Sequence, residues 1–161
     1  MIVFLDFDGV LHPELPSGRT NDDYLFCRLP SLESWLRDTP EVDVVISSSW
    51  RESYSFSKIV SFFAEDVKGR VLGCTPVLSR AGKEEFGGEL PPLRFPREAE
   101  VLHWLAASAE PWRPWAALDD QVHLFKPFNP RVIICDPTVG LTAVELRAVD
   151  AVFGIARRNC R

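Results

Sequence analysis

The first segment of the chain, MIVFLDFDGVLH, joins a short apolar run to two aspartates and a glycine. Residues 2–5 are β-branched, aromatic or aliphatic, and Gly9 follows closely, which predicts a buried strand and not a helix. Alternation along an extended chain places Asp6 and Asp8 on the same side, with Phe7 on the other. Two like charges about 4 Å apart repel by about 4 kcal/mol at an effective dielectric constant near 20. The position of these two carboxylates at the end of a strand therefore requires an explanation.

Two further apolar runs end in polar residues. Residues 42–47 (VDVVIS) end in the first of three consecutive serines, Ser47 to Ser49. Residues 115–118 (WAAL) are followed by Asp119 and Asp120. Continuous apolar runs of this kind are typical of parallel strands that are covered on both faces. In such sheets ligands bind beyond the carboxyl ends of the strands.

Helical patterns separate these strands. Helices are predicted around Leu32 to Leu36, around residues 59–63 and around residues 101–105, with a further strand over residues 131–135. Thr142 followed by Glu145 forms a capping box that opens a last helix. Residues 13–30 are predicted to be a long loop. Residues 69–97 receive no firm element, although the first ten of them could hold a strand. Alternating strands and helices favour an α/β fold with a mostly parallel sheet, in a single domain over residues 1–161.

Charge and cysteine usage narrow the functional classes. The 18 Lys and Arg against 23 Asp and Glu give a net charge of -5, which disfavours non-specific binding of nucleic acid or anionic membranes but allows a local basic pocket. The four cysteines lack metal-ligand spacing, which indicates reduced thiols. The first apolar run is too short for a signal peptide, and no segment is long enough to span a membrane. We expect a cytoplasmic protein without a membrane partner.

Four carboxylates follow the predicted strands: Asp6, Asp8, Asp119 and Asp120. If the sheet brings these strand ends together, the acids crowd one region and require a cation. An all-oxygen set without nearby His or Cys indicates a hard ion, and Mg²⁺ is the expected cofactor.

Three segments resemble known motifs. VFLDFDGVL resembles the first motif of the haloacid dehalogenase superfamily of phosphatases, VVISSS the second, and AALDD the fourth. The resemblance implies a Rossmann-like three-layer sandwich. Insertions that form a cap domain in this family are short here, at about residues 10–30 and 51–96. A minimal cap or none, and an open site, are therefore expected.

The resemblance also implies roles for the aspartates. Asp6 would be the nucleophile that forms an aspartyl-phosphate, and Asp8 the acid and base that moves the proton. The Asp6 carboxylate, the Asp8 backbone carbonyl and one acid of the fourth motif, Asp119 or Asp120, would hold Mg²⁺. The presence of Asp8 favours phosphoryl chemistry over dehalogenation.

The phosphate-binding residues follow less directly. The serine that binds phosphate would be Ser47 or Ser48, with Ser49 further out. Arg97, at the head of the helix before the fourth motif, is the expected cation, with Lys83 and Arg94 as alternatives. The order of motifs disfavours Lys126. Trp50 and Arg51 could lie beside the substrate, whereas His12, His103 and His123 are isolated and are expected to be structural.

The expected function is a Mg²⁺-dependent phosphomonoesterase. Small domains with DFDGVLH and SSSWR also resemble phosphatase modules associated with RNA repair, so an RNA or DNA end phosphatase is an alternative. The substrate would accordingly be a small phosphate ester or a phosphorylated nucleic-acid end. A second alternative is a non-catalytic module that binds a phosphorylated ligand.

Overall fold

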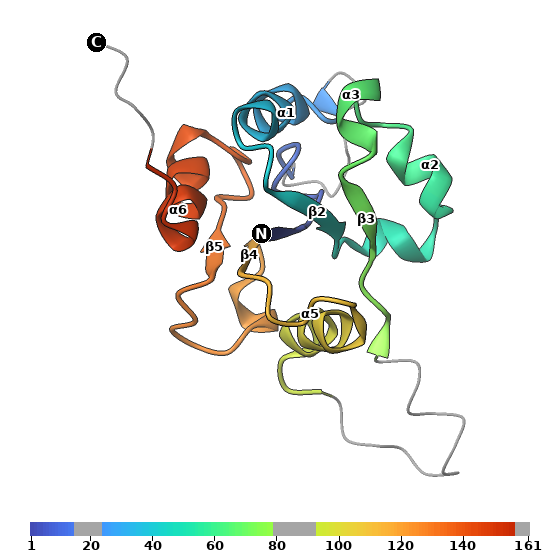
Figure 1. The fold of residues 1–161 in the computed structure, drawn as a ribbon, viewed down its shortest axis with the longest axis vertical. Coiled ribbons are helices and arrows are strands. Elements are labelled where there is room, and N and C mark those ends of the chain that lie inside the picture. The colour runs from blue at the N-terminus through green and yellow to red at the C-terminus, as the bar shows by residue number, and fades with distance from the viewer. Residues whose placement is uncertain (15–23, 79–92, 157–161) are drawn as a thin grey trace.

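A five-stranded parallel sheet forms the centre of the protein in the computed structural model (Figure 1). The structure describes residues 1–14, 24–78 and 93–156. The strand order is β3-β2-β1-β4-β5, and all four neighbouring pairs run parallel. The strands are β1 (Ile2–Leu5), β2 (Asp43–Ile46), β3 (Val71–Cys74), β4 (Trp115–Asp119) and β5 (Val132–Ile134).

Helices cover both faces of this sheet (Figure 1). On one face lie α1 (Leu29–Asp38), α2 (Phe56–Val60), α3 (Glu65–Lys68) and α6 (Ala143–Phe153), and on the other lies α5 (Pro96–Ala107). Two short 3₁₀ helices, η2 (Ser49–Glu52) and η3 (Val122–Leu124), follow β2 and β4. The architecture is the expected α/β three-layer sandwich.

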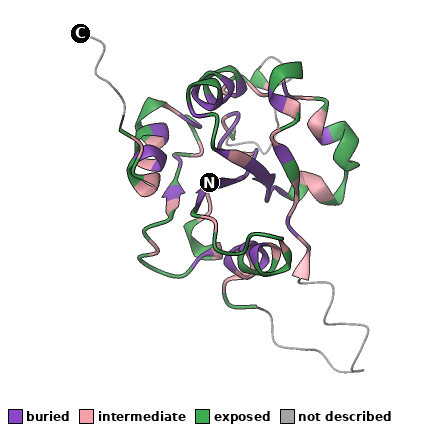
Figure 2. Ribbon diagram, viewed as in Figure 1, coloured by how far each residue is buried: buried purple, intermediate pink, exposed green. Residues whose placement is uncertain are grey.

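Strand β1 lies in the middle of the sheet, and its four side chains are buried (Figure 2). Val3 and Leu5 pack into the core beneath α1 and α6, whereas Ile2 and Phe4 pack toward α5. Because both faces are covered, the strand is apolar throughout and does not alternate with polar residues. Burial of each such side chain stabilises the fold by about 1.5–3 kcal/mol, so the start of the chain is fixed firmly.

The chain changes direction across the sheet at β1. The first half builds β1, β2 and β3 outward to one edge, and the second half returns to place β4 on the other side of β1. A reversal of this kind leaves a crevice beyond the carboxyl ends of the two adjoining strands. Asp6 and Asp8 follow β1 and Asp120 follows β4, so the fold brings them to this point.

The structure differs from the sequence prediction in two places and supplies an element for one segment that was left open. The helix expected over residues 59–63 ends at Val60, and a separate α3 follows after a turn. The helix α1 begins at Leu29, inside the predicted loop, because Pro30 occupies the first turn, where no backbone donor is required. Strand β3 lies in the segment that had no firm assignment.

The expectation of a minimal cap or none concerns two insertions, at about residues 10–30 and 51–96. Residues 53–78 lead through α2 and α3 into β3, so they belong to the layers of the sandwich and form no separate lid. The remainder of the two insertions, residues 15–23 and 79–92, lies outside the described part of the chain. None of the helices in the described ranges is long and apolar enough to cross a membrane.

The predicted capping box opens α6. The Thr142 hydroxyl accepts a hydrogen bond from the Val144 backbone N–H at 3.1 Å, and the Glu145 carboxylate accepts one from the Thr142 backbone N–H at 2.8 Å. We expect Thr142→Ala to lower the free energy of unfolding by about 1 kcal/mol, because it leaves a helix N–H without its side-chain acceptor. Denaturant titration measures the change. Thr142→Ser keeps the hydroxyl and serves as the control; an equal loss in both variants would contradict this account.

Candidate active site

Three polar residues stand in one row across the carboxyl edge of the sheet. The register pairs Leu5 with Ile46 on one side and with Leu118 on the other, so the next residues, Ser47, Asp6 and Asp119, are neighbours. The ladder continues into this row: the Ser47 N–H donates to the Leu5 carbonyl at 2.9 Å, and the Asp6 N–H donates to the Leu118 carbonyl at 3.0 Å. Paired residues on adjacent strands point to the same face. The sheet therefore places a hydroxyl and two carboxylates side by side.

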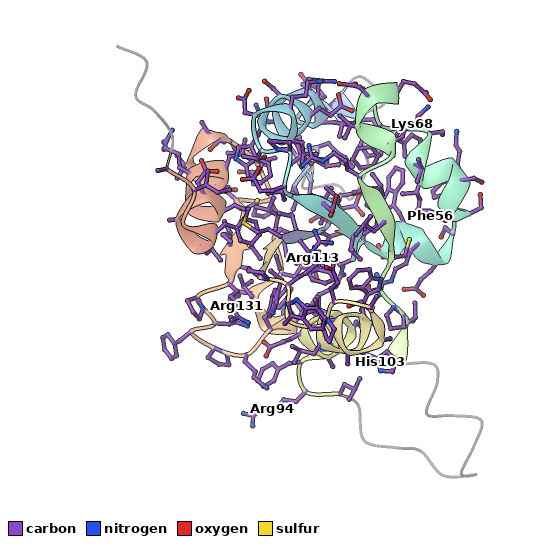
Figure 3. All side chains as sticks on the ribbon, in the orientation of Figure 1. Phe56, Lys68, Arg94, His103, Arg113 and Arg131 are labelled. Atoms are coloured by element: carbon purple, nitrogen blue, oxygen red, sulfur yellow. The ribbon has the colours of Figure 1, made fainter. Side chains whose placement is uncertain are left out.

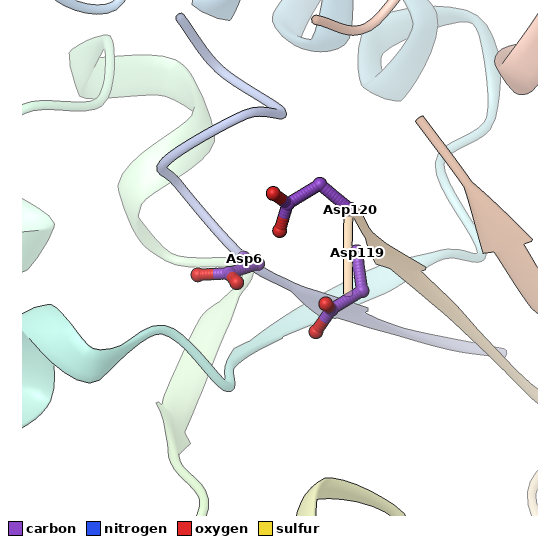
Figure 4. Close-up of side chains that lie close together, drawn as sticks. All are labelled: Asp6, Asp119 and Asp120. Atoms are coloured by element: carbon purple, nitrogen blue, oxygen red, sulfur yellow. The ribbon is translucent and has the colours of Figure 1, made fainter. Parts of the chain in front are cut away.

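Asp6, Asp119 and Asp120 form an acidic cluster (Figure 4). Each offers a carboxylate oxygen, and these oxygens lie within 4.8 Å of one another. Among the described residues, Oδ2 of Asp119 and Oδ1 of Asp120 are buried without a hydrogen-bond partner. Buried oxygens without donors are expensive to desolvate unless a cation meets them. An all-oxygen set suits Mg²⁺, and the cluster fits that ion.

The pKa values of the cluster reflect this crowding. Burial, reinforced by the neighbouring charge of Asp6, raises the pKa of Asp119 to about 7. Burial together with the charges of Asp6 and Glu14 raises the pKa of Asp120 to about 6. Without a cation, the folded protein therefore holds protons at this site that the unfolded chain would release near pH 4.

Gly9 makes room for one member of the cluster. Its φ is +66°, in the left-handed region, and a Cβ atom built there would lie 2.7 Å from the carboxylate carbon of Asp120. Only glycine satisfies both the conformation and the space. The glycine of the first motif thus supports the position of an acid that follows it by more than a hundred residues.

Among the described residues, Arg97 forms ion pairs with the cluster. It lies in the first turn of α5, buried, with one terminal nitrogen 3.8 Å from Asp6 Oδ2 and 3.8 Å from Asp119 Oδ2. Within the described ranges this nitrogen makes no hydrogen bond. Arg97 therefore offsets part of the negative charge and keeps a donor available for an anion.

The other candidate cations lie elsewhere or outside the described residues. Arg94 is exposed and points away from the body of the protein, over the ring of Phe95 at 5.3 Å (Figure 3). Lys126 lies 3.5 Å from Glu98 and is largely exposed. Lys83 falls in residues 79–92, which the structure does not describe. The geometry favours Arg97.

The two candidate serines have different surroundings. Both are buried, but the Ser48 hydroxyl accepts from the Trp50 backbone N–H and caps η2. The Ser47 hydroxyl makes no hydrogen bond to any group in the described part of the chain, and its residue stands in the row with Asp6. Ser49 is exposed. The geometry favours Ser47 as the serine that meets a ligand.

Arg51 is engaged by groups within the fold, and its place beside a substrate stays a prediction. Its guanidinium donates to the backbone carbonyls of Ser47 at 2.5 Å and Ser48 at 2.7 Å, and to the Glu100 carboxylate at 2.6 Å. Glu100 lies on α5, one turn after Arg97. Arg51 therefore fastens the serine loop to the helix that carries the cation. Sequence reasoning could not find this link, because 49 residues separate the two partners.

The Asp8 side chain lies apart from the acidic cluster. Its Oδ1 is 3.0 Å from Nε2 of His12, and its Oδ2 accepts from the indole N–H of Trp50 at 2.9 Å. Burial alone would raise the pKa of Asp8, but these two hydrogen bonds outweigh it and lower the pKa. His12 is therefore not isolated, contrary to the expectation from the sequence. Its spacing of four residues from Asp8 could have indicated the contact between the two side chains. His103 and His123 are exposed.

The close approach of Gly9 and Asp120 leads to a test of the cluster. We expect Gly9→Ala to raise at least tenfold the Mg²⁺ concentration needed for half-maximal thermal stabilisation, because the new Cβ displaces the Asp120 carboxylate and strains the backbone. Thermal unfolding over a Mg²⁺ series measures the effect. Gly69→Ala is the matched control, since nothing lies within 4 Å of its added Cβ. Equal Mg²⁺ dependence in both variants would contradict this role for Gly9.

The raised pKa of Asp119 gives a pH dependence with a definite sign. A carboxyl group whose folded pKa is raised stabilises the protein fully below its unfolded pKa near 4, and that contribution is lost as the pH rises through about 7. In the presence of a chelator, Asp119→Asn should therefore become more stable relative to the unmodified protein between pH 5 and pH 8. Melting temperatures at both pH values measure the difference. Added Mg²⁺ should reverse the order at pH 8, and a difference that does not change with pH would refute the assignment.

Comparison with known proteins gives one family. Residues 2–146 match the family described as the HAD domain in Swiss Army Knife RNA repair proteins. No curated protein and no solved structure matches the chain. The match spans most of the sequence and includes the row at the sheet edge, the acidic cluster and Arg97. The chain belongs to this family of HAD domains, as the resemblance of its motifs to the haloacid dehalogenase superfamily indicated.

Proposed function

We propose that the protein is a Mg²⁺-dependent phosphomonoesterase that acts through an aspartyl-phosphate on Asp6. The observation that carries the proposal is the position of Asp6 between Ser47 and Asp119 in the row, with Arg97 3.8 Å away. A nucleophile, a hydroxyl donor, a cation and a cluster suited to a metal thus meet at one point. The uncatalysed hydrolysis of phosphomonoesters is among the slowest reactions known, and this combination of groups is suited to accelerate it.

The first half of the reaction transfers the phosphoryl group to the protein. Ser47 and Arg97 would donate hydrogen bonds to the phosphate oxygens. The Phe7 N–H donates to Asp6 Oδ1 at 2.8 Å and fixes the orientation of the nucleophile. The Asp6 carboxylate attacks phosphorus, the bond to the leaving oxygen breaks, and Asp8 gives that oxygen a proton. The negative charge of the phosphate favours the protonated form of Asp8 and so opposes the lowering of its pKa.

The second half releases phosphate. Asp8, now a carboxylate, takes a proton from water as the water oxygen attacks phosphorus. The bond between phosphorus and Asp6 breaks, and inorganic phosphate leaves. Both aspartates return to their initial states, so the cycle balances in atoms and protons.

The carboxylates of Asp6, Asp119 and Asp120, with the backbone carbonyl of Asp8, would hold Mg²⁺. When bound, the ion would screen the nucleophile from the anionic phosphate and stabilise the charge that develops in the transition state. The donor-free oxygens of Asp119 and Asp120 support this assignment.

For the substrate, we propose the phosphorylated end of an RNA. The support is the family, which is named for RNA repair proteins. The net charge of -5 opposes broad attraction to nucleic acid and favours recognition confined to the phosphate and its nearest nucleotide. A small-molecule phosphate ester is the other candidate.

Substitution of the nucleophile tests the mechanism. We expect Asp6→Asn to reduce Mg²⁺-dependent phosphate release by a factor on the order of 10⁴ or more, because the amide cannot attack phosphorus. Release from 4-nitrophenyl phosphate and from phosphorylated RNA oligonucleotides measures the change. Asp66→Asn, an exposed aspartate on α3, is the control. Undiminished turnover in Asp6→Asn would refute the mechanism.

The same assay separates the candidate functions. A higher kcat/KM for the oligonucleotide that falls with added salt supports the RNA end, whereas equal values for both substrates argue against it. Tight binding of the oligonucleotide with no release of phosphate would indicate a non-catalytic binding module. Intact Asp6 and Asp8 speak against that module, since binding alone requires neither nucleophile nor acid.

A further inference from the structure

Two side chains to which the family match assigns no role bind the carboxylate of Asp8, the proposed acid and base. Each oxygen of the Asp8 carboxylate meets a different group: Oδ1 meets Nε2 of His12 at 3.0 Å, and Oδ2 meets the indole N–H of Trp50 at 2.9 Å. The two partners come from different segments, one from the turn after β1 and one from η2. A carboxylate held at both oxygens has a fixed plane.

The tautomer of His12 follows from its surroundings. The ring is buried, and in the described part of the chain its Nδ1 has no hydrogen-bond partner. A buried N–H without an acceptor costs more than a buried lone pair without a donor, because donors in proteins are rarely left unpaired. The proton therefore belongs on Nε2, where it is donated to Asp8. Both contacts to Asp8 are then donor to carboxylate.

Packing fixes the two donors. The Trp50 ring lies edge-on to Phe7 and Phe26, with centroid distances of 5.7 and 5.3 Å, and the His12 ring lies edge-on to Phe26 at 5.5 Å. Residues of the turn are held by the backbone as well: the Leu141 N–H donates to the Val10 carbonyl at 2.7 Å. Functional groups are positioned well when the side chains that hold them are themselves locked by packing.

The Asp8 carboxyl must face the leaving oxygen and not the acidic cluster. It is absent from the set of oxygens that lie within 4.8 Å in that cluster, although only one residue separates it from Asp6. Without the two donors, rotation about its side-chain bonds would let it turn, and a small misplacement of a catalytic group lowers the rate strongly. We propose that His12 and Trp50 are positioning residues that hold the Asp8 carboxyl for proton transfer to the leaving group.

This inference rests on the proposed phosphomonoesterase function, and the leaving group provides its test. An alkoxide needs a proton as it departs, whereas 4-nitrophenolate is a stable anion that needs little help. Benzyl phosphate and 4-nitrophenyl phosphate have similar size and differ in this respect. The ratio of their kcat/KM values covers only the steps up to departure of the leaving group. It therefore reports on proton transfer to that group, and not on general damage to the site or on the later hydrolysis of the aspartyl-phosphate.

Four variants are compared in this assay. Trp50→Phe removes the indole donor and keeps an aromatic ring, and His12→Leu removes the imidazole donor. Both should lower kcat/KM for benzyl phosphate at least tenfold more than kcat/KM for 4-nitrophenyl phosphate, and Asp8→Asn should show the same pattern more strongly. His12→Gln, which retains an N–H donor at a similar reach, should restore much of the ratio.

Trp35→Phe is the matched control. Trp35 also donates its indole N–H to a buried carboxylate, that of Asp150, at 2.8 Å between α1 and α6. Its substitution removes the same type of contact away from the row and should leave the ratio unchanged. An equal loss on both esters in Trp50→Phe and His12→Leu would overturn the inference. Failure of the unmodified protein to release phosphate from both esters and from phosphorylated RNA oligonucleotides would instead overturn the proposed function.

A measurement without substrate or metal tests the hydrogen bond itself. In long-range ¹H–¹⁵N spectra of the metal-free protein, His12 should show the neutral tautomer with the proton on Nε2, and Asp8→Asn should move its resonances. A proton on Nδ1 would overturn the inference, whatever the activity of the protein.

Discussion

Repulsion among the carboxylates at the end of the sheet is the constraint on which the other features of the site depend. Asp6 and Asp119 are forced together because their strands pair in register, and Asp120 follows in the chain. Each close pair costs a few kcal/mol, a large share of the 5–15 kcal/mol by which a domain is usually stable. The apolar strands supply the stability that tolerates this arrangement, and Arg97 offsets part of the charge. A bound cation would remove the remainder.

The sequence was sufficient for those parts of the site that strand ends determine. Apolar runs followed directly by Asp6 and by Asp119 predicted the sheet, its mostly parallel pairing and the meeting of these acids, because parallel strands end at one edge. The helix predicted around residues 59–63 had inaccurate bounds and α3 was not predicted, since short helices depend on tertiary packing more than on local pattern. Strand β3 was uncertain for a similar reason: it has only one buried residue, Val71.

Contacts made by long side chains across the fold could not be predicted. The bond from Trp50 to Asp8 spans 42 residues, and the ion pair between Arg51 and Glu100 spans 49. No periodicity or motif encodes such partners, since the first depends on how η2 packs against the loop after β1 and the second on how η2 packs against α5. The backbone hydrogen bonds of the sheet position the row that contains Asp6. The side chains of η2 position the loops on either side of that row.

The pairing of the strands sets the spacing between Ser47, Asp6 and Asp119. Adjacent strands lie about 4.8 Å apart because their backbone hydrogen bonds require it, whatever the side chains nearby. Asp6 and its two neighbours are therefore separated by distances that the backbone hydrogen bonds of the sheet hold nearly constant. Changes in the core or in the covering helices can alter the melting temperature of the protein. The spacing of the row stays the same as long as the sheet is folded. We therefore expect chains of this architecture to differ mainly in the loops around this edge, because the sheet sets the geometry of the edge itself.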